Sequence, residues 1–519
     1  MHKRALLSVS DKRGIESFAA GLIKLGYEII STGGTEKALR KKKIPVTSVE
    51  KITGFPECFG GRLKTLHPLI FGGILFKRED KEQVKEAKKL GIEPIDVVCV
   101  NLYPFEETAE KKDAKREELI EQIDIGGPSL LRAAAKNAAN VTVICDPDDY
   151  DRVLQSLTLD LPAEDRDLLL GLRNELAEKV FLHTATYDTA ITKTLSGGEH
   201  TGVLLTKKTL LRYGENPHQW GAFYEIAGNP PEWKVLQEDK EKGISYLNIL
   251  DADGAWNLVC EFLEPTVACI KHANPCGVAS HKKIAEAFQI AYDADRLSAF
   301  GVIIAMNRTC SASIIERILE QKIFTEIIIA PSYEPKALEL LKKKPKVRAI
   351  GHSQQLTVNS SQLTNSSQFT SYRSALGGML IQNLDTRVIT AKDLTCVTEK
   401  KPTKEQIRDL LFAWKVVKHA KSNAIVFVKD AVTIGIGAGQ TSRVDATMIA
   451  ARRAGEKAKG AVMASDAFFP FPDSVEEAAK HGISAIVQPG GSVRDQEVIA
   501  KADALGITMV FTGVRGFRH

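Results

Sequence analysis

Short apolar runs alternate with amphipathic stretches along the first 150 residues of the chain. Runs rich in Val, Ile and Leu predict strands, and stretches with apolar residues three and four positions apart predict helices. Strands are expected at Arg4–Ser8, Tyr27–Ser31, Val46–Val49, Val97–Leu102 and Val141–Asp146, and helices at Gly14–Leu25, Thr35–Lys42, Lys81–Leu90 and Pro128–Ala138. This alternation favours an α/β domain with a mostly parallel sheet.

A long helical pattern from Ala163 to about Thr194 ends the first region. The Ser196-Gly197-Gly198 sequence, with the polar stretch that continues to Thr206, is typical of a linker. We therefore place a domain boundary near residue 198, which separates a domain of residues 1–198 from one of residues 199–519.

The second region is predicted to contain two α/β halves, at about residues 199–365 and 366–519. Strands are expected at Thr266–Lys271, Gly301–Met306 and Glu326–Ala330 in the first half, and at Ala424–Val428, Thr433–Gly437, Ala461–Ala464 and Ala485–Gln488 in the second. Between them, Gly351–Tyr372 is dense in Ser, Gln, Asn and Thr, which predicts a surface crossing or an edge hairpin. The similar spacing favours two related halves, although no repeat of individual residues is apparent.

Composition and charge narrow the function classes. The chain has 519 residues, of which 44% are hydrophobic and 26% charged, and this profile excludes bulk disorder. A net charge of +5 is too small for a surface that coats nucleic acid, and favours local pockets for small phosphorylated or carboxylated ligands. Eight cysteines without a CxxC pair predict reduced thiols. No apolar run reaches the ~20 residues of a membrane helix, so we expect a cytoplasmic protein without membrane or nucleic-acid partners.

Two turns at the same edge of the predicted sheet have the composition of phosphate sites. The segment Ser31, Thr32, Gly33, Gly34 and Thr35 joins a strand to a helix, and Ser8–Lys12 follows the first strand. Backbone N–H groups at a helix N-terminus attract anions, and open α/β sheets bind ligands at the carboxyl ends of their strands. The alternative for the first segment is a tight turn capped by Thr35.

The loop Gly60–Pro68 concentrates cations between glycines. It contains Arg62, Lys64, Thr65 and His67, and no Gly-Lys-Ser/Thr occurs in the chain, so a Walker-type ATP site loses its main support. Glycines let backbone amides approach a ligand, which favours a binding loop over the alternative of a solvated surface loop.

Asp124 precedes a predicted helix that carries Arg132 and Lys136 four positions apart. Helix capping beside a solvated basic stripe is the alternative, but Asn101 and Tyr103 end another strand at the proposed ligand edge. The carboxylate and the two cations are therefore expected to share one neighbourhood.

Lys271 and His272 close a predicted strand and are followed by the turn-forming Asn274-Pro275. A lysine and a histidine at a strand end are suited to proton transfer and oxyanion stabilisation, and the alternative is a buried histidine beside a lysine. A zinc deaminase site would need HxE and PCxxC, and the chain has neither, so no metal is expected.

Three other segments of the second region are candidates for ligand contacts. Leu211–Gln219 supplies Arg212, Tyr213 and His218, and Gly435–Arg443 fails the dinucleotide fingerprint because Gln440 stands where a glycine is needed. A backbone anion nest with Arg443 is more economical. The segment Ser465–Asp473 holds three phenylalanines, which form either a core plug or one wall of a flat ligand's site.

Together these motifs resemble one family, the bifunctional purine biosynthesis enzymes with 5-aminoimidazole-4-carboxamide ribonucleotide (AICAR) formyltransferase and IMP cyclohydrolase activities. The resemblance covers the whole chain, from SVSDK through STGGT, GGRLKTLHP, NLYPF, IDIGGPSLLRAAAKN, LRYGENPHQ, KHANPCG, SNAIVF, GIGAGQTSR and SDAFFPF to VRGFRH. It implies a methylglyoxal-synthase-like N-terminal parallel-sheet domain, a transformylase domain of two cytidine-deaminase-like α/β subdomains, and a homodimer.

The resemblance also implies two consecutive reactions. The C-terminal domain would transfer a formyl group from 10-formyltetrahydrofolate, a cosubstrate, to the AICAR amine, giving FAICAR. The N-terminal domain would then close the ring to IMP with loss of water, and no metal or redox cofactor is required.

For formyl transfer, the substrate amine is a poor nucleophile that needs a base and an oxyanion partner, and we assign these roles to His272 and Lys271. The resemblance places further residues around the nucleotide and the folate: Arg212, Tyr213, Asn248, Gly301, Glu326, Asn423, Arg443, Phe468, Ser492 and Arg515. Glu326 stands where some relatives have Asp, and Val302 where many have a second Gly.

For ring closure, Lys136 and Asp124 are the acid/base candidates, and which of them takes the proton stays open. The remaining positions support the base and oxyanion or receive the phosphate and ribose: Lys64, Thr65, Asn101, Tyr103, Arg62, Gly126, Ser10, Asp11, Lys12 and Ser31–Thr35. Two other functions compete, a lyase of methylglyoxal-synthase type fused to a binding module, and a nucleotide-sensing scaffold without turnover. The lyase would leave the KHANPCG segment unexplained.

Overall fold

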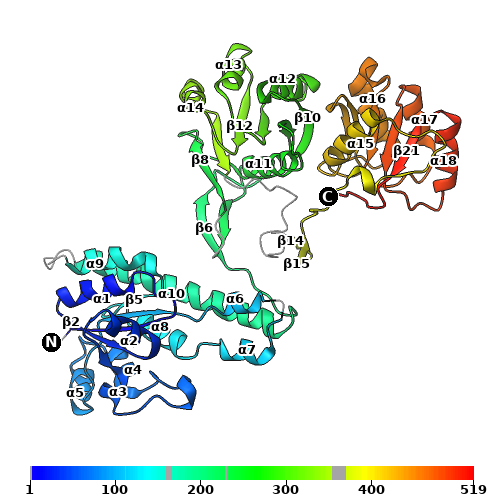
Figure 1. Ribbon diagram of the computed structural model, residues 1–519. Helices are drawn as coiled ribbons and strands as arrows, with labels where there is room; N and C mark the ends of the chain where they lie inside the picture. The colour runs from blue at the N-terminus through cyan, green and yellow to red at the C-terminus, as the bar shows by residue number, and fades with distance from the viewer. Residues whose placement is uncertain (1–2, 112, 159–165, 228–230, 353–369) are drawn as a thin grey trace. The chain divides into compact units, whose positions relative to one another are not determined.

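The computed structural model describes residues 3–111, 113–158, 166–227, 231–352 and 370–519 (Figure 1). The chain forms two compact units. The first runs to Thr206, and the second takes in Lys207–Glu225 and nearly all of the chain that follows.

The first unit is built on a five-stranded sheet in the order β3-β2-β1-β4-β5, in which every pairing is parallel. Its strands are β1 (Lys3–Val9), β2 (Tyr27–Ser31), β3 (Thr47–Ser48), β4 (Val97–Asn101) and β5 (Thr142–Ile144). Because all strands are parallel, their carboxyl ends meet at one edge, where the loops that follow β1, β2 and β4 come together. The predicted parallel α/β architecture is confirmed.

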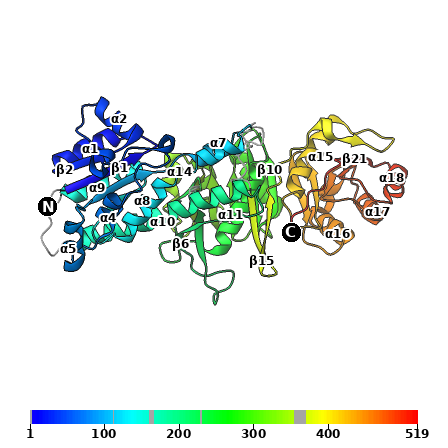
Figure 2. The ribbon, with the colours of Figure 1, turned by 90° about the horizontal axis from the view of Figure 1, so that it is seen from below.

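Helices cover this sheet with one apolar face each. In α1 (Ile15–Lys24), Ile15, Phe18, Ala19 and Leu22 are buried at helical spacing, and the Phe18 ring stacks on Tyr150 with centroids 4.5 Å apart. The other helices are α2 (Gly33–Lys41), α3 (Val49–Thr53), α4 (Pro68–Leu75), α5 (Lys81–Lys89), α6 (Phe105–Ala109), α7 (Arg116–Glu121), α8 (Gly126–Lys136), α9 (Tyr150–Thr158) and α10 (Arg166–Leu195). Helix α10 packs against α8 (Figure 2). The start of the helix predicted from Ala163 lies outside the described residues.

The second unit contains a twelve-stranded sheet in the order β16-β21-β20-β19-β17-β18-β10-β9-β11-β12-β13-β8. The first half supplies β8 (Trp233–Gln237), β9 (Thr266–Lys271), β10 (Asn274–Ser280), β11 (Val302–Met306), β12 (Thr325–Ala330) and β13 (Arg348–His352). The second half supplies β16 (Thr395–Cys396), β17 (Ile425–Lys429), β18 (Val432–Gly437), β19 (Val462–Ser465), β20 (Ala485–Gln488) and β21 (Thr508–Phe511). The halves join where β10 pairs with β18, at Ala279 and Val432.

The two halves repeat one topology. Each begins with an edge strand, continues through a helix, an antiparallel hairpin and a second helix, and ends with three strands that are parallel to one another. The helices are α11 (Tyr246–Val259), α12 (Ile284–Ala294), α13 (Ala312–Glu320) and α14 (Pro335–Leu341), and then α15 (Lys404–Val417), α16 (Arg443–Ala454), α17 (Asp473–Lys480) and α18 (Asp495–Ala504). Helices α11 and α15 pack on the hairpins of their own halves.

The repeat extends to individual residues, which sequence analysis did not detect. Helices α11 and α15 both begin with a capping box, of Ser245 with Asn248 and of Thr403 with Gln406. The members of each equivalent pair are 158 positions apart: Ser245 and Thr403, Asp251 and Asp409, Trp256 and Trp414, Lys271 and Lys429, and Gly277 and Gly435. Trp256 and Trp414 are both buried. The hint of two related halves is thus borne out in both topology and sequence.

Two small hairpins complete the described part of the second region, β6 (Leu205–Leu210) with β7 (Ala222–Ile226) and β14 (Thr370–Ala375) with β15 (Gly378–Asn383). Most of the predicted crossing at Gly351–Tyr372 lies outside the described residues. The eight cysteines are all free thiols. Within the described ranges, no helix combines the length and the apolar character needed to cross a bilayer.

Candidate functional site

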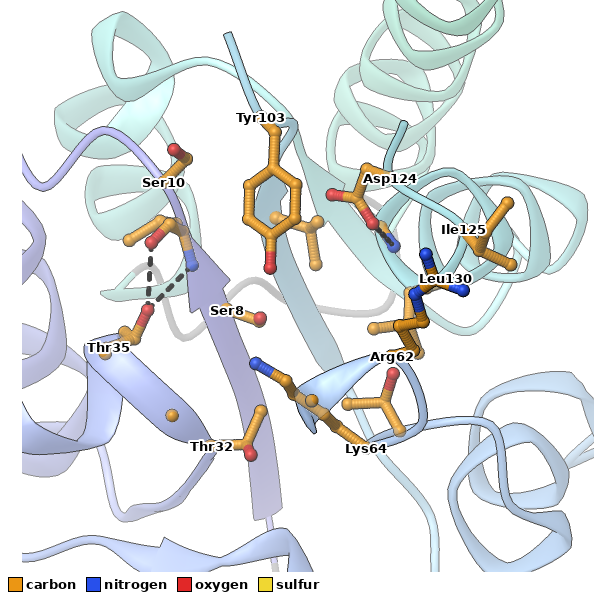
Figure 3. A pocket seen from close by; sticks show the side chains of 18 of the residues that line it. Ser8, Ser10, Thr32, Thr35, Arg62, Lys64, Tyr103, Asp124, Ile125 and Leu130 are labelled. Carbon is orange, nitrogen blue, oxygen red and sulfur yellow. Dashed lines mark hydrogen bonds between the residues drawn. The ribbon is translucent and has the colours of Figure 1, made fainter. Parts of the chain in front are cut away.

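A cavity of about 570 Å³ opens at the carboxyl edge of the parallel sheet in the first unit (Figure 3). Thirteen of the predicted site residues line it: Ser10, Lys12, Thr32, Gly33, Gly34, Thr35, Arg62, Lys64, Thr65, Asn101, Tyr103, Asp124 and Gly126. The loops that sequence analysis assigned to one ligand edge therefore do converge on one space.

The N-terminus of α2 forms one wall of this cavity. Thr32 caps the helix without a side-chain hydrogen bond, and Gly33 has a φ of 55°, which glycine adopts without steric cost. The Thr35 hydroxyl accepts from the Val9 N–H at 2.9 Å and donates to the Val9 carbonyl, so the helix is tied to β1. Lys12 lies beside Gly34, and the positive end of the helix and this ammonium together suit an anion.

The segment between α3 and α4 supplies cations to another wall of the cavity. The Lys64 ammonium lies 3.6 Å from the Glu57 carboxylate and near Gly33, and it points into the same space as the Tyr103 hydroxyl (Figure 3). Arg62 is paired with Glu121. Both cations therefore line the cavity, and each has a carboxylate partner.

Asp124 closes the cavity at the start of α8. Its carboxylate accepts from the Gly127 N–H at 2.7 Å, and its own N–H donates to the Tyr187 hydroxyl at 2.8 Å. Burial raises the pKa of Asp124, while the N–H groups of Gly127 and Tyr103 and the charge of Lys64 act in the opposite direction. A carboxyl whose pKa is raised in a cavity has the property expected of a proton acceptor.

Two predicted phosphate residues do not line the cavity. Ser31 is fully buried and its hydroxyl donates to the Leu7 carbonyl at 2.7 Å, so it serves the sheet. Asp11 is turned to Arg13, whose backbone N–H and guanidinium lower the pKa of its carboxyl. Asn101 lines the cavity but is committed to the loop, because its side-chain oxygen accepts from the N–H groups of Ser10 and Asp11.

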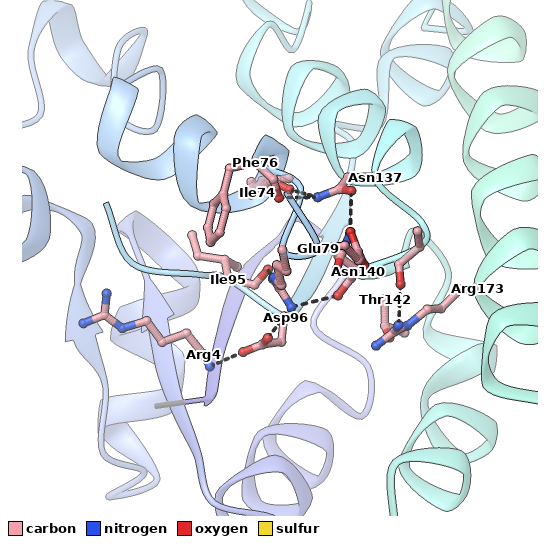
Figure 4. Close-up of polar contacts among 12 residues, drawn as sticks. Arg4, Ile74, Phe76, Glu79, Ile95, Asp96, Asn137, Asn140, Thr142 and Arg173 are labelled. Carbon is pink, nitrogen blue, oxygen red and sulfur yellow. Dashed lines mark hydrogen bonds and ion pairs between the residues drawn. The ribbon is translucent and has the colours of Figure 1, made fainter. Parts of the chain in front are cut away.

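Lys136 lies at the far end of α8 from Asp124. It is exposed in the last turn, and eleven residues of helix span about 17 Å. The next residue, Asn137, donates to the Ile74 carbonyl at 2.7 Å and belongs to a network around Asp96 and Asn140 at the amino ends of the strands (Figure 4). The structure therefore does not bring Lys136 into the neighbourhood that the sequence predicts for it.

In the second unit, Lys271 and His272 occupy the hairpin between β9 and β10. The Lys271 ammonium donates to the Phe300 carbonyl at 2.6 Å, and a Cβ on Gly301 would come within 3.2 Å of that ammonium. His272 is exposed at the turn, so the expected alternative of a buried histidine does not hold. The two side chains are accessible to a ligand and lie beside Gly301.

Four other predicted residues of the second unit contact one another in pairs, and a further contact links the hairpin to the second half. The Asn248 side-chain N–H donates to the Glu326 carboxylate at 2.8 Å. The Arg212 guanidinium stacks on the Tyr213 ring at 4.6 Å. Asn274 accepts from the Lys421 N–H at 2.9 Å, which links the hairpin to the segment that carries Asn423 in the second half.

The second-half candidates form a cluster of their own. Arg443 is buried, pairs with Asp466 and donates to the Phe468 carbonyl at 3.1 Å, so the predicted anion nest at this arginine is replaced by an internal ion pair. Arg443 and Arg515 both lie over the Phe517 ring. Ser492 is occupied by the Arg494 N–H and has no described contact with this cluster. Of the three phenylalanines, Phe469 is core, whereas Phe468 and Phe471 are exposed.

Several residues that hold these sites in place were not predicted. Gly127 lines the cavity, Tyr187 of α10 anchors Asp124, and Asp251 of α11 contacts the hairpin turn. Gly127 is next to the predicted Gly126, which was a usable signal, whereas Tyr187 and Asp251 lie far from the motifs in sequence. Ser8, which belongs to the predicted turn Ser8–Lys12, also lines the cavity. Within the described ranges, no group of three metal-ligating side chains occurs.

Comparisons with known proteins cover the whole chain. Residues 134–453 match the family described as AICARFT/IMPCHase bienzyme, and residues 14–129 match the MGS-like domain. The bifunctional purine biosynthesis proteins PurH of Bacillus subtilis (strain 168) and Bacillus thuringiensis subsp. konkukian (strain 97-27) are each 49% identical over 526 aligned positions, which cover 100% of this chain and 99% and 100% of theirs. A solved structure, the crystal structure of ForH, covers 37% of this chain and 98% of its own at 38% identity, and its TM-score of 0.32 is too low to support an argument about the fold.

Proposed function

Because the chain belongs to the AICARFT/IMPCHase bienzyme family, it catalyses the last two steps of IMP biosynthesis, and we propose that each step has its own site in one of the two units. The protein is both a formyltransferase, with 10-formyltetrahydrofolate as the donor, and a cyclohydrolase. One observation supports the assignment of the two reactions to different units. The residues that line the cavity all precede residue 131, whereas the Lys271-His272 hairpin lies in the second unit.

Formyl transfer is assigned to Lys271 and His272. The AICAR amine is conjugated with the carboxamide and must lose a proton as it attacks the formyl carbon, and the exposed His272 imidazole is the base that accepts it. The Lys271 ammonium, held by the Phe300 carbonyl, stabilises the oxygen that becomes negative during the attack. The bond between the formyl carbon and N10 of the folate then breaks, and tetrahydrofolate leaves with the proton that His272 took from the amine. Arg212, Tyr213, Asn248 and Glu326 bind the ribonucleotide, and Asn423, Phe468 and Arg515 complete the site from the second half. Arg443 supports this part of the site through its ion pair with Asp466 and its hydrogen bond to the Phe468 carbonyl, and Ser492 remains a candidate for a ligand contact.

Ring closure is assigned to the cavity of the first unit. The carboxamide nitrogen attacks the formyl carbon, and Asp124 accepts the proton that this nitrogen loses. The former formyl oxygen then leaves as water with this proton and with the proton of the formylated nitrogen, as the C=N bond of IMP forms. Lys64 and Tyr103 face the same space and stabilise the developing oxyanion. The 5′-phosphate binds at the N-terminus of α2 with Lys12 and Thr32–Thr35. Lys136 remains the second acid/base candidate, with the weaker geometry.

The proposal includes a cytoplasmic homodimer without nucleic-acid or membrane partners. Large apolar side chains are exposed on the β14–β15 hairpin, among them Leu376, Met379, Leu380 and Ile381. Exposed apolar surface of this kind is typical of contacts between subunits. Sedimentation at assay concentrations tests the dimer directly.

One assay tests the assignment of both sites. Purified protein is incubated with AICAR and 10-formyltetrahydrofolate, and folate consumption and IMP formation are followed together. His272→Ala and Lys271→Ala are expected to lower formyl transfer at least a hundredfold while the cyclisation of added FAICAR stays at the wild-type rate. Loss of cyclisation alone in these variants would reverse the assignment of the two sites.

A further inference from the structure

The turn that carries His272 has an unusual backbone. His272 and Ala273 have φ values of 51° and 56°, the left-handed region that side-chain-bearing residues seldom adopt, and they follow one another without a glycine. The directions of the Lys271 and His272 side chains depend on this turn, because the two residues form its first corner. Such a turn persists when an outside contact holds it.

Asp251 of α11 supplies that contact. Its carboxylate accepts a hydrogen bond from the Ala273 N–H at 2.7 Å. The carboxylate is partly buried, and burial raises its pKa, whereas the Ala273 N–H and the nearby His272 and Lys271 lower it and Glu326 raises it. Asp251 thus sits among the transfer residues, one helical turn after Asn248, without having been part of any motif.

The internal repeat contains the same arrangement without the chemistry. Asp409 of α15 accepts from the N–H groups of Asp430 and Ala431 at 2.8 and 3.0 Å, and these two turn residues have φ values of 54° and 57°. Asp430 occupies the position of His272, so this turn carries no imidazole. It lies at the opposite end of the β10–β18 pairing from the His272 turn, because β10 and β18 are antiparallel and pair at Ala279 and Val432. The hydrogen bond from the turn to a helix aspartate is therefore a feature of both halves. Only in the first half does the turn also carry the side chains that we assign to formyl transfer.

We propose that Asp251 is a positioning residue for formyl transfer, which acts by accepting the Ala273 N–H and thereby fixes the directions in which Lys271 and His272 leave the turn. This inference rests on the proposed assignment of transfer to those two residues. A hydrogen-bond acceptor at this position is what the role requires, and the negative charge is not. The neutral Asp251→Asn side chain retains an oxygen that can accept the same hydrogen bond.

The test compares Asp251→Ala, Asp251→Asn and Asp409→Ala in the full-length protein, with kcat and KM for AICAR and folate measured separately. Asp251→Ala is expected to lower kcat for transfer at least tenfold with both KM values within threefold of wild type, and Asp251→Asn to keep kcat within threefold. Asp409→Ala, which unties the equivalent turn, is the matched control and is expected to keep transfer within twofold. Cyclisation is expected to be unchanged in all three.

Several outcomes would overturn the proposal. A wild-type kcat in Asp251→Ala removes the positioning role, and an equal loss in Asp251→Asn shows that the charge matters rather than the hydrogen bond. Should Asp251→Ala be unstable, Asp251→Glu replaces it, because the extra methylene displaces the acceptor oxygen, and an undiminished kcat there also contradicts the role.

His272→Ala and a triple variant separate this inference from the assignment on which it rests. If Asp251 acts through Lys271 and His272, adding Asp251→Ala to a protein that carries both Lys271→Ala and His272→Ala causes less than a threefold further loss. A further tenfold loss in the triple variant would contradict the role. If His272→Ala keeps full formyltransferase activity, the proposed function of the hairpin is wrong. If His272→Ala is inactive but Asp251→Ala is fully active, only the positioning role of Asp251 is wrong.

Discussion

Asp124 is the carboxylate of the cavity lining that is best suited to accept a proton, because it faces the cavity and its pKa is raised. It lies at the start of α8, within the electrostatic reach of Lys64, and burial raises its pKa above the ordinary value of 3.8. Glu121, the other carboxylate of the lining, is paired with Arg62. Because a base must be ionised to act, the rate of ring closure should fall as the pH drops through the raised pKa of Asp124.

Asp124→Asn is expected to lower ring closure by a factor of about 10² to 10⁴, the usual contribution of a general base, and to remove the acidic limb of the pH–rate profile. Because the pKa of the Asp124 carboxyl is higher in the folded protein than in the unfolded chain, this carboxyl stabilises the folded state at pH values below its unfolded pKa. That stabilisation is lost as the pH rises through the folded pKa. At neutral pH the substitution should therefore leave the melting temperature unchanged or higher. FAICAR cyclisation from pH 4 to 9 and thermal melts at pH 7 measure both effects.

Lys136→Ala is the matched comparison on the same helix. Lys136 is exposed about 15 Å from the start of α8. It precedes Asn137, whose contacts are drawn in Figure 4, so its removal should slow ring closure far less than Asp124→Asn does, by less than tenfold. Steady-state cyclisation of both variants decides the question. A loss at Lys136→Ala equal to that at Asp124→Asn would restore the lysine as a direct participant.

At the scale of secondary-structure elements, two glycines let a hairpin strand lie against the helix that follows it. A Cβ on Gly277 would come within 2.0 Å of the Ala291 carbonyl oxygen of α12, and one on Gly435 within 2.1 Å of the Ala450 carbonyl oxygen of α16. If alanine replaced either glycine, the helix backbone could not move aside as a flexible side chain can, so the strand and the helix would have to separate.

Gly277→Ala and Gly435→Ala should each destabilise the second unit by about 3 kcal/mol, the upper part of the range for overpacking. Gly378→Ala in β15 is the control, because its Cβ would meet nothing closer than the Ala375 carbonyl at 3.7 Å. Urea unfolding monitored by tryptophan fluorescence reports the difference, since Trp256 and Trp414 are buried in this unit. A Gly277→Ala protein as stable as the control would show that the close packing is not required.

The fold and the cavity were more predictable from sequence than the residues that support them. Parallel strands bring their carboxyl ends to one edge, so motifs after β1, β2 and β4 had to meet, and thirteen of the predicted residues do line the cavity. Ser31 turns away because it is the last residue of strand β2 and donates to the Leu7 carbonyl of the neighbouring strand. Asp11 turns away because it pairs with Arg13 in the loop, and no hydrophobic periodicity encodes such a contact. Lys136 was misplaced because residues close in sequence lie at opposite ends of a helix.

The internal repeat escaped detection for a different reason. Its equivalent residues are 158 positions apart, far beyond any window in which apolar spacing is read. Between matching positions such as Asp251 and Asp409, or Trp256 and Trp414, most other residues of the two halves differ. The match becomes visible only when the strands and helices of the two halves are paired by their order in the sheet. Asp251 was missed for a similar reason, because the residue that it contacts, Ala273, lies 22 positions away and outside any short sequence window around Asp251.

At the scale of the whole molecule, the two activities should be separable. A fragment ending near residue 198 contains the five-stranded sheet, all the residues that line the cavity, and α10, which ends at Leu195. We expect this fragment to cyclise FAICAR at a rate within threefold of the full chain and to have no formyltransferase activity. A folded fragment of the correct mass that does not cyclise would contradict the assignment of ring closure to the first unit.

The formyltransferase site of the proposed homodimer can be tested for residues contributed by both subunits. In one copy of the chain, the His272 hairpin contacts Asp251 and Lys421, while Arg515 lies with Arg443 over the Phe517 ring. If the site of the proposed homodimer takes His272 from one subunit and Arg515 from its partner, neither His272→Ala nor Arg515→Ala alone assembles an intact site. In a heterodimer of the two variants, one site carries both substitutions and the other carries neither.

Mixing the two inactive variants after reversible dissociation should therefore restore activity. Random pairing makes half of the dimers mixed, and half of their sites intact, so about a quarter of the wild-type formyltransferase rate is expected. Each variant mixed with itself is the control, and cyclisation should be unaffected throughout, because the cavity to which we assign it is lined by residues of one unit of one chain. Full transfer by a species that sediments as a monomer, or no recovery in a mixture that does form heterodimers, would place both residues in the same subunit's site.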